Sequence, residues 1–527
     1  MTGLGFLRRL RFTGGPRFFE TGRWLFLSVS IGIVSGIGAI AFDQIFRLAS
    51  RWLLLEVGGY VPEAPGSEQF LSPVGPGAPW RLVLSTVVGG LVAGFIVFKL
   101  APEAEGHGTD AVIASFHRGL GKIRRRVPLV KMLASSVTIG SGGSAGREGP
   151  IAQVGAGFGS FLGDLFKLSN RERRILMLAG TAGGIGSIFR APLGAALIRT
   201  EILYRDPDFE YEALLPGLLS SITGYSIYAS YAGYEPIFST PDLHFHSPLE
   251  LLGYAGLGIV CAIVAVVYVS VFYGSRDHFF DKLPIPRMLR PAVGAALLGL
   301  LAMAFPTVLG MGYGQVQAAI DGRLAAAWML AFVGLKIVAT SATISSGGSG
   351  GVFGPSLVIG GMVGGAFGTF LHSTLPGLAE SPAAFTMVGM GAFFAGAAKV
   401  PLAAVVMVME MTGSYGLLVP ALLAASVAYL LTPLRWSLYE NQVDNRMDSP
   451  AHLGSFSVDL LESLRVRDAM RTAIEGRLLS ESRLVDEILD RLRSEGAAAY
   501  AVVDDEGCLT GLLTVDGIRR AIVRGDG

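Results

Sequence analysis

One ionisable residue stands at a place in the sequence where a charge is costly. Glu148 lies in the run Gly146-Arg-Glu-Gly-Pro150, directly before an apolar helical stretch. The run breaks one helix and starts another, since proline is tolerated in a first helical turn. Free backbone N–H groups and the positive end of the helix dipole favour an anion at such a start. We therefore expect an anion site here, for which the Glu148 carboxylate competes until protonation releases it.

Two simpler roles for Glu148 stay open from the sequence. Its carboxylate could cap the N-terminus of its own helix. It could also pair with the neighbouring Arg147. An ionisable group within an apolar segment is nevertheless a functional-site hypothesis by default, which favours the gating role.

The run around Glu148 occurs twice in the chain. Residues 141–150 and 346–355 agree at seven of ten positions at a shift of 205, and glycines four residues apart follow both copies. That spacing permits close helix contact in membranes. At a shift of 209, Glu201 falls on Glu410, each nine residues after a Pro-Leu pair begins. Helix breaks at corresponding places in two membrane halves predict a substrate site near the middle of the bilayer.

The composition is that of a polytopic membrane protein. Of the 527 residues, 51% are hydrophobic and 16% are charged, and the mean hydropathy is +0.53. Soluble domains carry roughly a quarter charged residues. Several apolar runs approach or exceed the roughly 20 residues that span a bilayer; they are 24–49, 80–100, 251–273, 288–305 and 325–343.

Charge and composition divide the chain into four predicted parts. They are a basic N-terminal segment at 1–21, a first membrane repeat at 22–235, a second at 249–445 and a small cytosolic α/β module at 459–527. In that module we expect helices over 470–493 and 516–523 and strands at 498–503 and 509–514 around a turn. Basic residues before the first span predict a cytoplasmic N-terminus. The net charge of +1 gives no indication of nucleic-acid binding.

Other polar motifs carry weaker predictions. Lys122-Ile-Arg-Arg-Arg126 with Lys131 is expected to be a positive flank at the inner membrane face, which would also attract anions. His244 and His246 form a His-x-His pair without an acidic or sulfur partner at metal spacing, so a surface loop is favoured over a metal site. Neither glycine run ends in the Lys-Ser/Thr of a phosphate-binding loop, which disfavours an enzyme or a nucleotide-driven pump that would bind phosphate there.

The two motifs Gly146-Arg-Glu-Gly-Pro150 and Gly351-Val-Phe-Gly-Pro355 resemble the signatures of the CLC family of chloride channels and H⁺/Cl⁻ antiporters. The likeness covers about residues 20 to 445 and includes the neighbourhood of Glu410. It implies an all-α polytopic fold, an inverted repeat of tilted and broken helices, in which a homodimer has one chloride pathway per subunit. It also implies an integral protein of a prokaryotic plasma membrane with both termini cytoplasmic.

The resemblance also implies roles for individual residues. Glu148 matches the gating glutamate, and Tyr439 matches a tyrosine whose hydroxyl closes the inner side of the central anion site. The anion is expected to face backbone N–H groups at Arg147, Glu148, Gly149, Val352 and Phe353. The soluble tail resembles one copy of a CBS motif. No cofactor is expected, and adenine-nucleotide binding by the tail stays open without a specific residue to support it.

Two departures from the family pattern bear on mechanism. His107, in Gly106-His-Gly-Thr-Asp110, stands where members carry an anion-binding serine. A neutral imidazole can still donate one N–H, and a protonated one would add charge. Ile202 aligns with the inner proton glutamate of the antiporters, and its alkyl chain cannot relay protons. These residues narrowly favour a passive channel gated by Glu148 over an H⁺/Cl⁻ antiporter, with a non-conducting ligand-sensing receptor as a further alternative.

Overall fold

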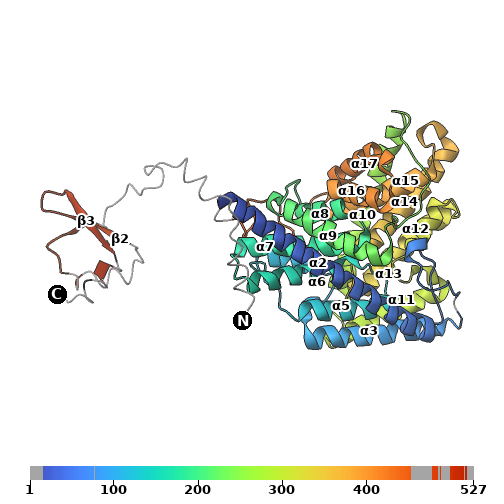
Figure 1. Ribbon diagram of the computed structural model, residues 1–527, viewed down its shortest axis with the longest axis horizontal. Helices are drawn as coiled ribbons and strands as arrows, with labels where there is room; N and C mark the ends of the chain where they lie inside the picture. Colours follow the sequence, from blue (N-terminus) through green and yellow to red (C-terminus); the bar gives the residue numbers. More distant parts are fainter. Residues whose placement is uncertain are drawn as a thin grey trace. The chain divides into compact units, whose positions relative to one another are not determined.

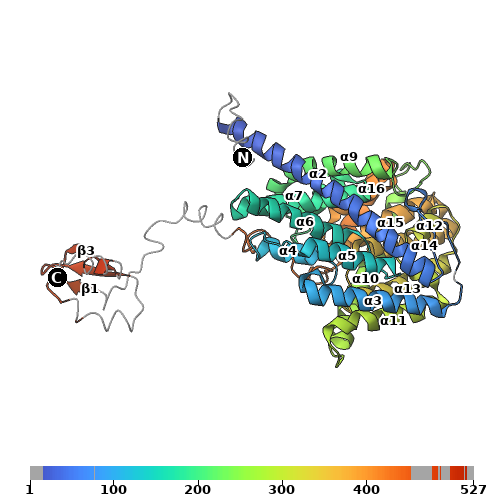
Figure 2. The same ribbon diagram turned by 60° about the horizontal axis from the view of Figure 1, so that its bottom comes forward.

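The chain forms two compact units, residues 1–453 and 454–527. The computed structural model describes residues 16–75, 77–452, 478–484, 487, 499–514, 517–518 and 521. The larger unit is helical, and the smaller holds a short β-sheet (Figures 1 and 2). The predicted fold class, an all-α part with a small C-terminal α/β module, is confirmed.

The described part of the larger unit is built from helices of very different lengths. The first half has α2 (Pro16–Ser50), α3 (Trp80–Leu100), α4 (Thr109–His117), α5 (Val127–Gly140), α6 (Glu148–Leu165), α7 (Asn170–Phe189), α8 (Pro192–Glu201) and α9 (Leu214–Ala232). The second half has α10 (Glu250–Ser275), α11 (Arg290–Ala304), α12 (Tyr313–Ile320), α13 (Ala326–Ile344), α14 (Phe353–Thr374), α15 (Pro382–Ala398), α16 (Pro401–Thr412) and α17 (Leu418–Leu431).

Shorter helical segments join or extend these helices. Two π-helical segments, Arg51–Val57 and Arg276–Phe280, extend α2 and α10. The 3-10 turns are Gly66–Glu68, Pro102–Ala104, Tyr211–Ala213, Arg287–Leu289, Pro306–Val308, Pro376–Leu378 and Tyr415–Leu417.

Each of the five predicted spans falls on a helix, namely α2, α3, α10, α11 and α13. Together with α14 they are the six described helices long and apolar enough to cross a membrane. Helix α2 already begins at Pro16, within the basic N-terminal segment, while its candidate membrane span runs over Gly22–Val57. In both views α2 runs obliquely across α5, α6, α7 and α9 (Figures 1 and 2).

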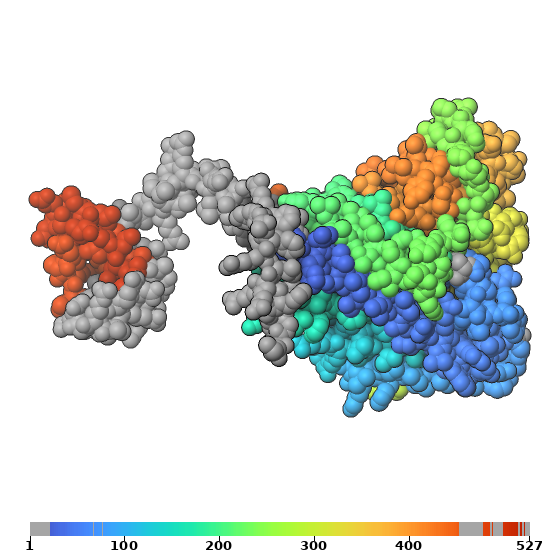
Figure 3. All heavy atoms as spheres, in the orientation of Figure 1, coloured from blue at the N-terminus to red at the C-terminus, as the bar shows by residue number. Residues whose placement is uncertain are grey.

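The order of long and short helices in α2–α9 is repeated in α10–α17. Glycines four residues apart allow two neighbouring helices in each half to pack at short distance. A methyl group on Gly155 or Gly159 of α6 would meet a carbonyl oxygen of α7, and one on Gly360 or Gly364 of α14 would meet a carbonyl oxygen of α15. Backbones approach this closely only where the Cβ is missing. In Figure 3 the first half, blue to green, covers much of the face seen, and orange to yellow parts of the second half appear at its upper right.

Two glutamates join the halves by capping each other's helices. The Glu201 carboxylate at the end of α8 accepts the N–H groups of Leu402 and Ala403 in the first turn of α16, at 3.1 and 2.8 Å. Glu410 in α16 accepts the N–H groups of Leu193 and Gly194 in α8, at 3.1 and 2.7 Å. The pairing is reciprocal, as a two-fold relation between the halves requires, and each acid satisfies donors that a helix start leaves free.

The smaller unit contains the predicted hairpin. Strands β2 (Ala499–Val503) and β3 (Leu509–Thr514) pair antiparallel around a turn closed by the Gly507 N–H and the Asp504 carbonyl. A third strand, β1 (Leu478–Ser480), pairs parallel with β2 and was not predicted. Strand β1 lies within the segment 470–493 that was predicted as a helix, so that prediction is wrong at 478–480. Most of the rest of the two predicted helices, 470–493 and 516–523, lies outside the described residues.

We predict that Glu201→Ala destabilises the larger unit. The N–H groups of Leu402 and Ala403 would lose their acceptor in a buried place, which costs about 1–3 kcal/mol. The measurement is unfolding of the purified protein in detergent micelles. The matched control is Glu212→Ala, since Glu212 pairs with the exposed Arg171 and surface pairs contribute about 0–1 kcal/mol. Equal stability of the two variants would contradict the capping role.

Candidate anion site

The two glycine runs meet in the centre of the larger unit. The Gly146 N–H donates to the Gly351 carbonyl at 2.8 Å, and the Gly351 N–H donates to the Gly146 carbonyl at 2.7 Å. This isolated antiparallel bridge brings together segments 205 positions apart. Helices α6 and α14 begin two residues after it, at Glu148 and Phe353. Two helix N-termini with free N–H groups therefore lie side by side, which is an arrangement that attracts an anion.

The Glu148 side chain occupies the N-terminus of the helix from the other half. Its Oε1 accepts the Phe353 N–H at 2.5 Å. The residue is 3% exposed, and Oε2 has no hydrogen-bond partner among the described residues. Of the roles considered from the sequence, pairing with Arg147 is not observed. A carboxylate oxygen here stands where a bound anion would accept the same N–H group.

Glycine is required on both sides of this carboxylate. A Cβ at Gly146 would clash with Oε2 of Glu148, and one at Gly351 would clash with Oε1. Gly149 lies against the backbone carbonyl of His107 in the same way. The glycines of the motif therefore leave room for the acid and for the loop that carries His107.

The Arg147 side chain turns away from Glu148 into a buried network. Its guanidinium donates to Asp43 at 2.9 Å and to Glu68, and Arg190 lies 3.9 Å from the same Glu68. All these charges are buried, so each needs a partner to offset its desolvation. Sequence analysis missed Asp43 and Glu68. Asp43 had a signal, because it is the one acid within the apolar run 24–49.

His107 and Tyr439 lie next to each other, and His107 lines a cavity. Their ring centroids are 5.3 Å apart, and the buried Nδ1 of His107 has no partner among the described residues. Gly106 and Gly108 have φ angles of 67° and 76°, which glycine adopts readily. A cavity of 490 Å³ opens here, and its lining includes Glu105, His107, Asp110, Arg276 and Glu440.

Two lysines hold the turns at corresponding places in the halves. Lys131 donates to the carbonyls of Ala104 and Gly106, and Lys336, 205 positions later, donates to those of Val308 and Gly310. Both are fully buried. The expectation that Lys131 belongs to a surface flank is therefore wrong. A further repeat, Gly106-His-Gly against Gly310-Met-Gly at a shift of 204, would have indicated this pair.

The remaining predicted residues surround the same centre. Val352 immediately precedes α14. The Phe353 ring packs against those of Phe189 and Phe394, with centroids 5.2 and 4.6 Å away. Ile202 is buried at the end of α8, and its carbonyl accepts the amide of Gln442 at 2.9 Å. Position 202 therefore offers an alkyl side chain and no carboxylate. The carboxylate of the adjacent Glu201 binds N–H groups at the start of α16.

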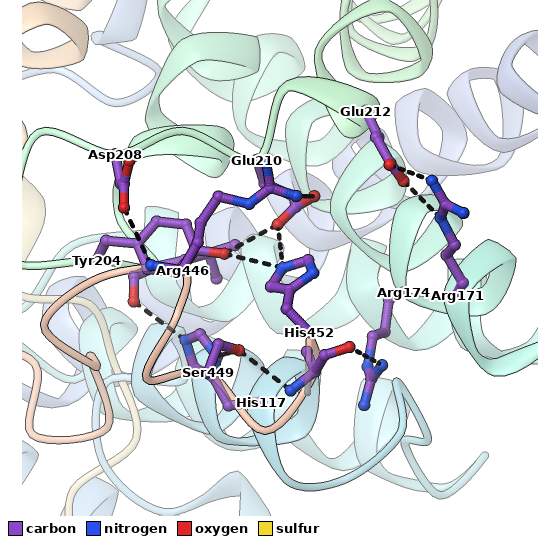
Figure 4. Close-up of polar contacts among 12 residues, drawn as sticks. His117, Arg171, Arg174, Tyr204, Asp208, Glu210, Glu212, Arg446, Ser449 and His452 are labelled. Carbon is purple, nitrogen blue, oxygen red and sulfur yellow. Dashed lines mark hydrogen bonds and ion pairs between the residues drawn. The ribbon is translucent and has the colours of Figure 1, made fainter. Parts of the chain in front are cut away.

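Polar contacts fasten the chain that follows Tyr439. Figure 4 shows the buried Glu210 carboxylate with Tyr204, His452 and Arg446, at 2.9, 2.7 and 3.4 Å. It also shows His117 at the end of α4, whose Nδ1 lies 2.7 Å from the Ser449 hydroxyl.

The same chain is tied to the start of α4. The Asn441 N–H donates to Asp110 at 2.9 Å. Both ends of α4 thus hold residues 441–452, which fixes Tyr439 next to the His107 turn.

Comparisons with known proteins agree with this architecture. Residues 89–433 match the sequence profile of the family described as voltage gated chloride channel. The chain is 33% identical over 413 residues to a ClcB-like chloride channel protein of Ralstonia nicotianae, covering 76% of this chain and 91% of that one. It is 29% identical over 425 residues to the H⁺/Cl⁻ exchange transporter ClcA of Vibrio cholerae, covering 78% and 86%.

A solved structure shares the fold. The crystal structure of a slow cyanobacterial Cl⁻/H⁺ antiporter superposes with a TM-score of 0.69 at 21% identity, covering 84% of this chain and 99% of that chain. With the paired helix N-termini and the extent of the sequence match, these findings establish that the chain is an integral membrane protein of the voltage gated chloride channel (CLC) family of anion transport proteins.

Proposed function

We propose that this protein exchanges protons for chloride through one shared site. The observation that carries the proposal is the Glu148 carboxylate on the Phe353 N–H at the start of α14. The same N–H groups serve a halide when the carboxylate leaves, because both are acceptors of similar charge. A glutamate leaves such donors most readily once protonated, since the neutral acid gains little from the helix dipole. Anion arrival and proton uptake are thereby linked at one residue.

This proposal replaces the preference for a passive channel. That preference depended on Ile202, whose side chain cannot relay a proton. The Vibrio cholerae relative is named an H⁺/Cl⁻ exchange transporter, which supports exchange, while the Ralstonia nicotianae relative is named a chloride channel protein. At the inner end of the proton path, the 490 Å³ cavity at His107 offers room for water, which could relay protons in place of a side chain.

His107 is proposed to bind the anion at the inner side of the route. Its ring lies beside that of Tyr439, and both His107 and Arg276 line the 490 Å³ cavity. A neutral imidazole donates through one nitrogen, and a protonated one adds a full charge. Binding must stay weak enough for the ion to leave.

Assembly and orientation follow the family likeness. We propose a homodimer with one chloride pathway in each subunit, both termini cytoplasmic, and a CBS-like role for the small C-terminal unit. Large apolar side chains on α9 and α17, including Leu215 and Leu430, are 70% and 76% exposed. Lipid or a second copy of the chain would cover them.

Exchange is tested by coupled flux in proteoliposomes. We expect a chloride gradient to drive protons against their own gradient and a pH gradient to shift the reversal potential. In Glu148→Gln, chloride should still flow while proton movement stops, because the amide neither titrates nor carries charge. Chloride flux that leaves pH unchanged in the unmodified protein would identify a channel instead.

Gly146→Ala should displace the Glu148 side chain without removing it. The new Cβ would meet only the Glu148 carboxylate among its nearest neighbours, and the φ of Gly146 is not in the left-handed region. We expect faster chloride flux at neutral pH than in the unmodified protein. The flux should also change less with pH than the roughly tenfold per pH unit that one titrating group can give. The measurement is flux between pH 5 and 8.

The control for this variant is the double change Gly146→Ala with Glu148→Ala. If the glycine acts through the glutamate, adding Gly146→Ala to Glu148→Ala leaves flux unchanged. A further change in flux would show that the added methyl group disturbs the helix N-terminus itself.

His107→Ala should weaken chloride binding equally at pH 5 and pH 8 when Glu148 no longer titrates. Burial, and after it Lys131, lowers the pKa of His107 to about 3, so the imidazole stays neutral over this range and offers the anion one N–H group. Its loss should weaken chloride binding at least about tenfold, since a hydrogen bond to a charged group contributes about 1.5–3 kcal/mol. The measurement is chloride calorimetry at pH 5 and 8, comparing Glu148→Gln with Glu148→Gln plus His107→Ala. Equal chloride affinity in both would contradict an anion contact by His107.

A further inference from the structure

Three potential metal ligands from two distant segments meet at one end of α10. The Nδ1 of His246 lies 3.2 Å from a carboxylate oxygen of Glu380. Glu250, in the first turn of α10, completes a group whose ligand atoms all lie within 4.8 Å of one another. The expectation that the His-x-His loop lacks an acidic partner is wrong, because folding brings one acid from 134 residues away and another from one helical turn away.

The spacing of these atoms suits a small divalent ion. Two ligand atoms at about 2.05 Å from a tetrahedral zinc lie roughly 3.3 Å apart. The contact between His246 and Glu380 already has that separation. The ligand atoms of the group lie within 4.8 Å of one another, so Glu250 would have to approach by up to about 1.5 Å to reach the spacing of a tetrahedral zinc site. One imidazole and two carboxylates with water in the fourth position form a donor set of the kind that binds zinc.

The two segments that carry these ligands are held together by packing. The Tyr254 ring, one turn beyond Glu250, stacks on Phe385 of α15 with centroids 4.3 Å apart. A Cβ at Gly253 would meet the Leu378 carbonyl, so α10 lies directly against the turn before α15. The His372 Nδ1 lies 2.8 Å from the carbonyl of Ala379, next to Glu380. Glu250 and Glu380 are thus positioned by rigid elements.

The supporting contacts also suit a ligand. Glu250 is buried, and its Oε1 accepts the Ser247 N–H at 3.0 Å. Ligating carboxylates are commonly hydrogen-bonded in this way. His246 and Glu380 are exposed, with side chains at 61% and 67%, so an ion can enter from solvent. Figure 3 shows the green loop 233–249 reaching the gold surface of the second half.

We propose that His246, Glu250 and Glu380 form a zinc site that cross-links the loop before α10 to the turn before α15. A surface ion pair between His246 and Glu380 alone would need no third group. The site lies at the opposite end of α10 from Arg276 and the cavity beside His107. Since α10 has 26 residues, that distance is about 39 Å, so the proposal does not depend on the exchange mechanism.

The test is zinc calorimetry on the full chain, purified in detergent without a polyhistidine tag. We expect one Zn²⁺ per chain, and an affinity lowered at least about tenfold by His246→Ala and by Glu380→Gln, because even supporting residues around a metal have effects of this size. The matched control is His244→Ala. His244 is two positions away and pairs with Asp242, so its loss should leave zinc affinity within about twofold.

Two further measurements examine the nature of the site. X-ray absorption of the zinc-loaded protein should show one imidazole nitrogen and otherwise oxygen at about 2.0–2.2 Å. Hydrogen exchange should slow in the loop 240–249 on adding zinc, since a cross-link opposes local opening. Adding Mg²⁺ should not slow hydrogen exchange in this loop, because Mg²⁺ prefers six oxygen ligands.

Several outcomes would overturn the proposal. They are unchanged zinc affinity in both His246→Ala and Glu380→Gln, an equal loss in His244→Ala, and an absorption spectrum with two imidazoles. The last two would indicate a His-x-His chelate without the carboxylates. Elution volume and zinc-free thermal unfolding of each variant should match the unmodified protein, so that loss of binding is not loss of fold.

Discussion

The structure depends on two helix N-termini held side by side. The paired hydrogen bonds between Gly146 and Gly351 place the starts of α6 and α14 together, although each presents unpaired N–H groups and the positive end of a dipole. Like partial charges repel in a medium of low dielectric, so an anionic group has to lie between them. The Glu148 carboxylate fills that place in the described structure, accepting the Phe353 N–H. The anion site is thus a consequence of how the halves join.

Duplication supplies the surrounding support twice. Lys131 and Lys336 each bind two carbonyls of a turn, and Glu201 and Glu410 each bind two N–H groups of the partner helix. Buried charges are tolerated where such partners offset their desolvation. The first half differs at Arg147, which needs a network of its own. Gene duplication therefore explains the symmetric scaffold, while Glu148, the acid proposed as the gate, belongs to one half only.

Sequence alone predicts what is local and periodic. Apolar runs indicated α2, α3, α10, α11 and α13, and Gly-Pro starts indicated the convergence of the two broken helices. Contacts between distant side chains have no periodic signal, so the partners of Arg147 and the approach of Glu380 to His246 were missed. Lys131 was misplaced for a related reason: the run 122–126 that precedes it is basic and largely exposed, whereas Lys131 itself is buried within α5. Alignment of the halves over the whole chain would have exposed the lysine pair.

Three glutamates bind the N–H groups at the start of a helix in the other half, and a comparison of them supports the proposed gate. In Glu201 and in Glu410 both carboxylate oxygens accept N–H groups, so leaving would strand two donors at once. Glu148 holds the Phe353 N–H with Oε1, while its Oε2 is buried without a partner among the described residues. An unpaired buried oxygen is costly when charged, and protonation relieves that cost. Under the proposed mechanism, the difference between a fixed cap and a movable one is therefore the second N–H donor, which Glu201 and Glu410 have and Glu148 lacks among the described residues.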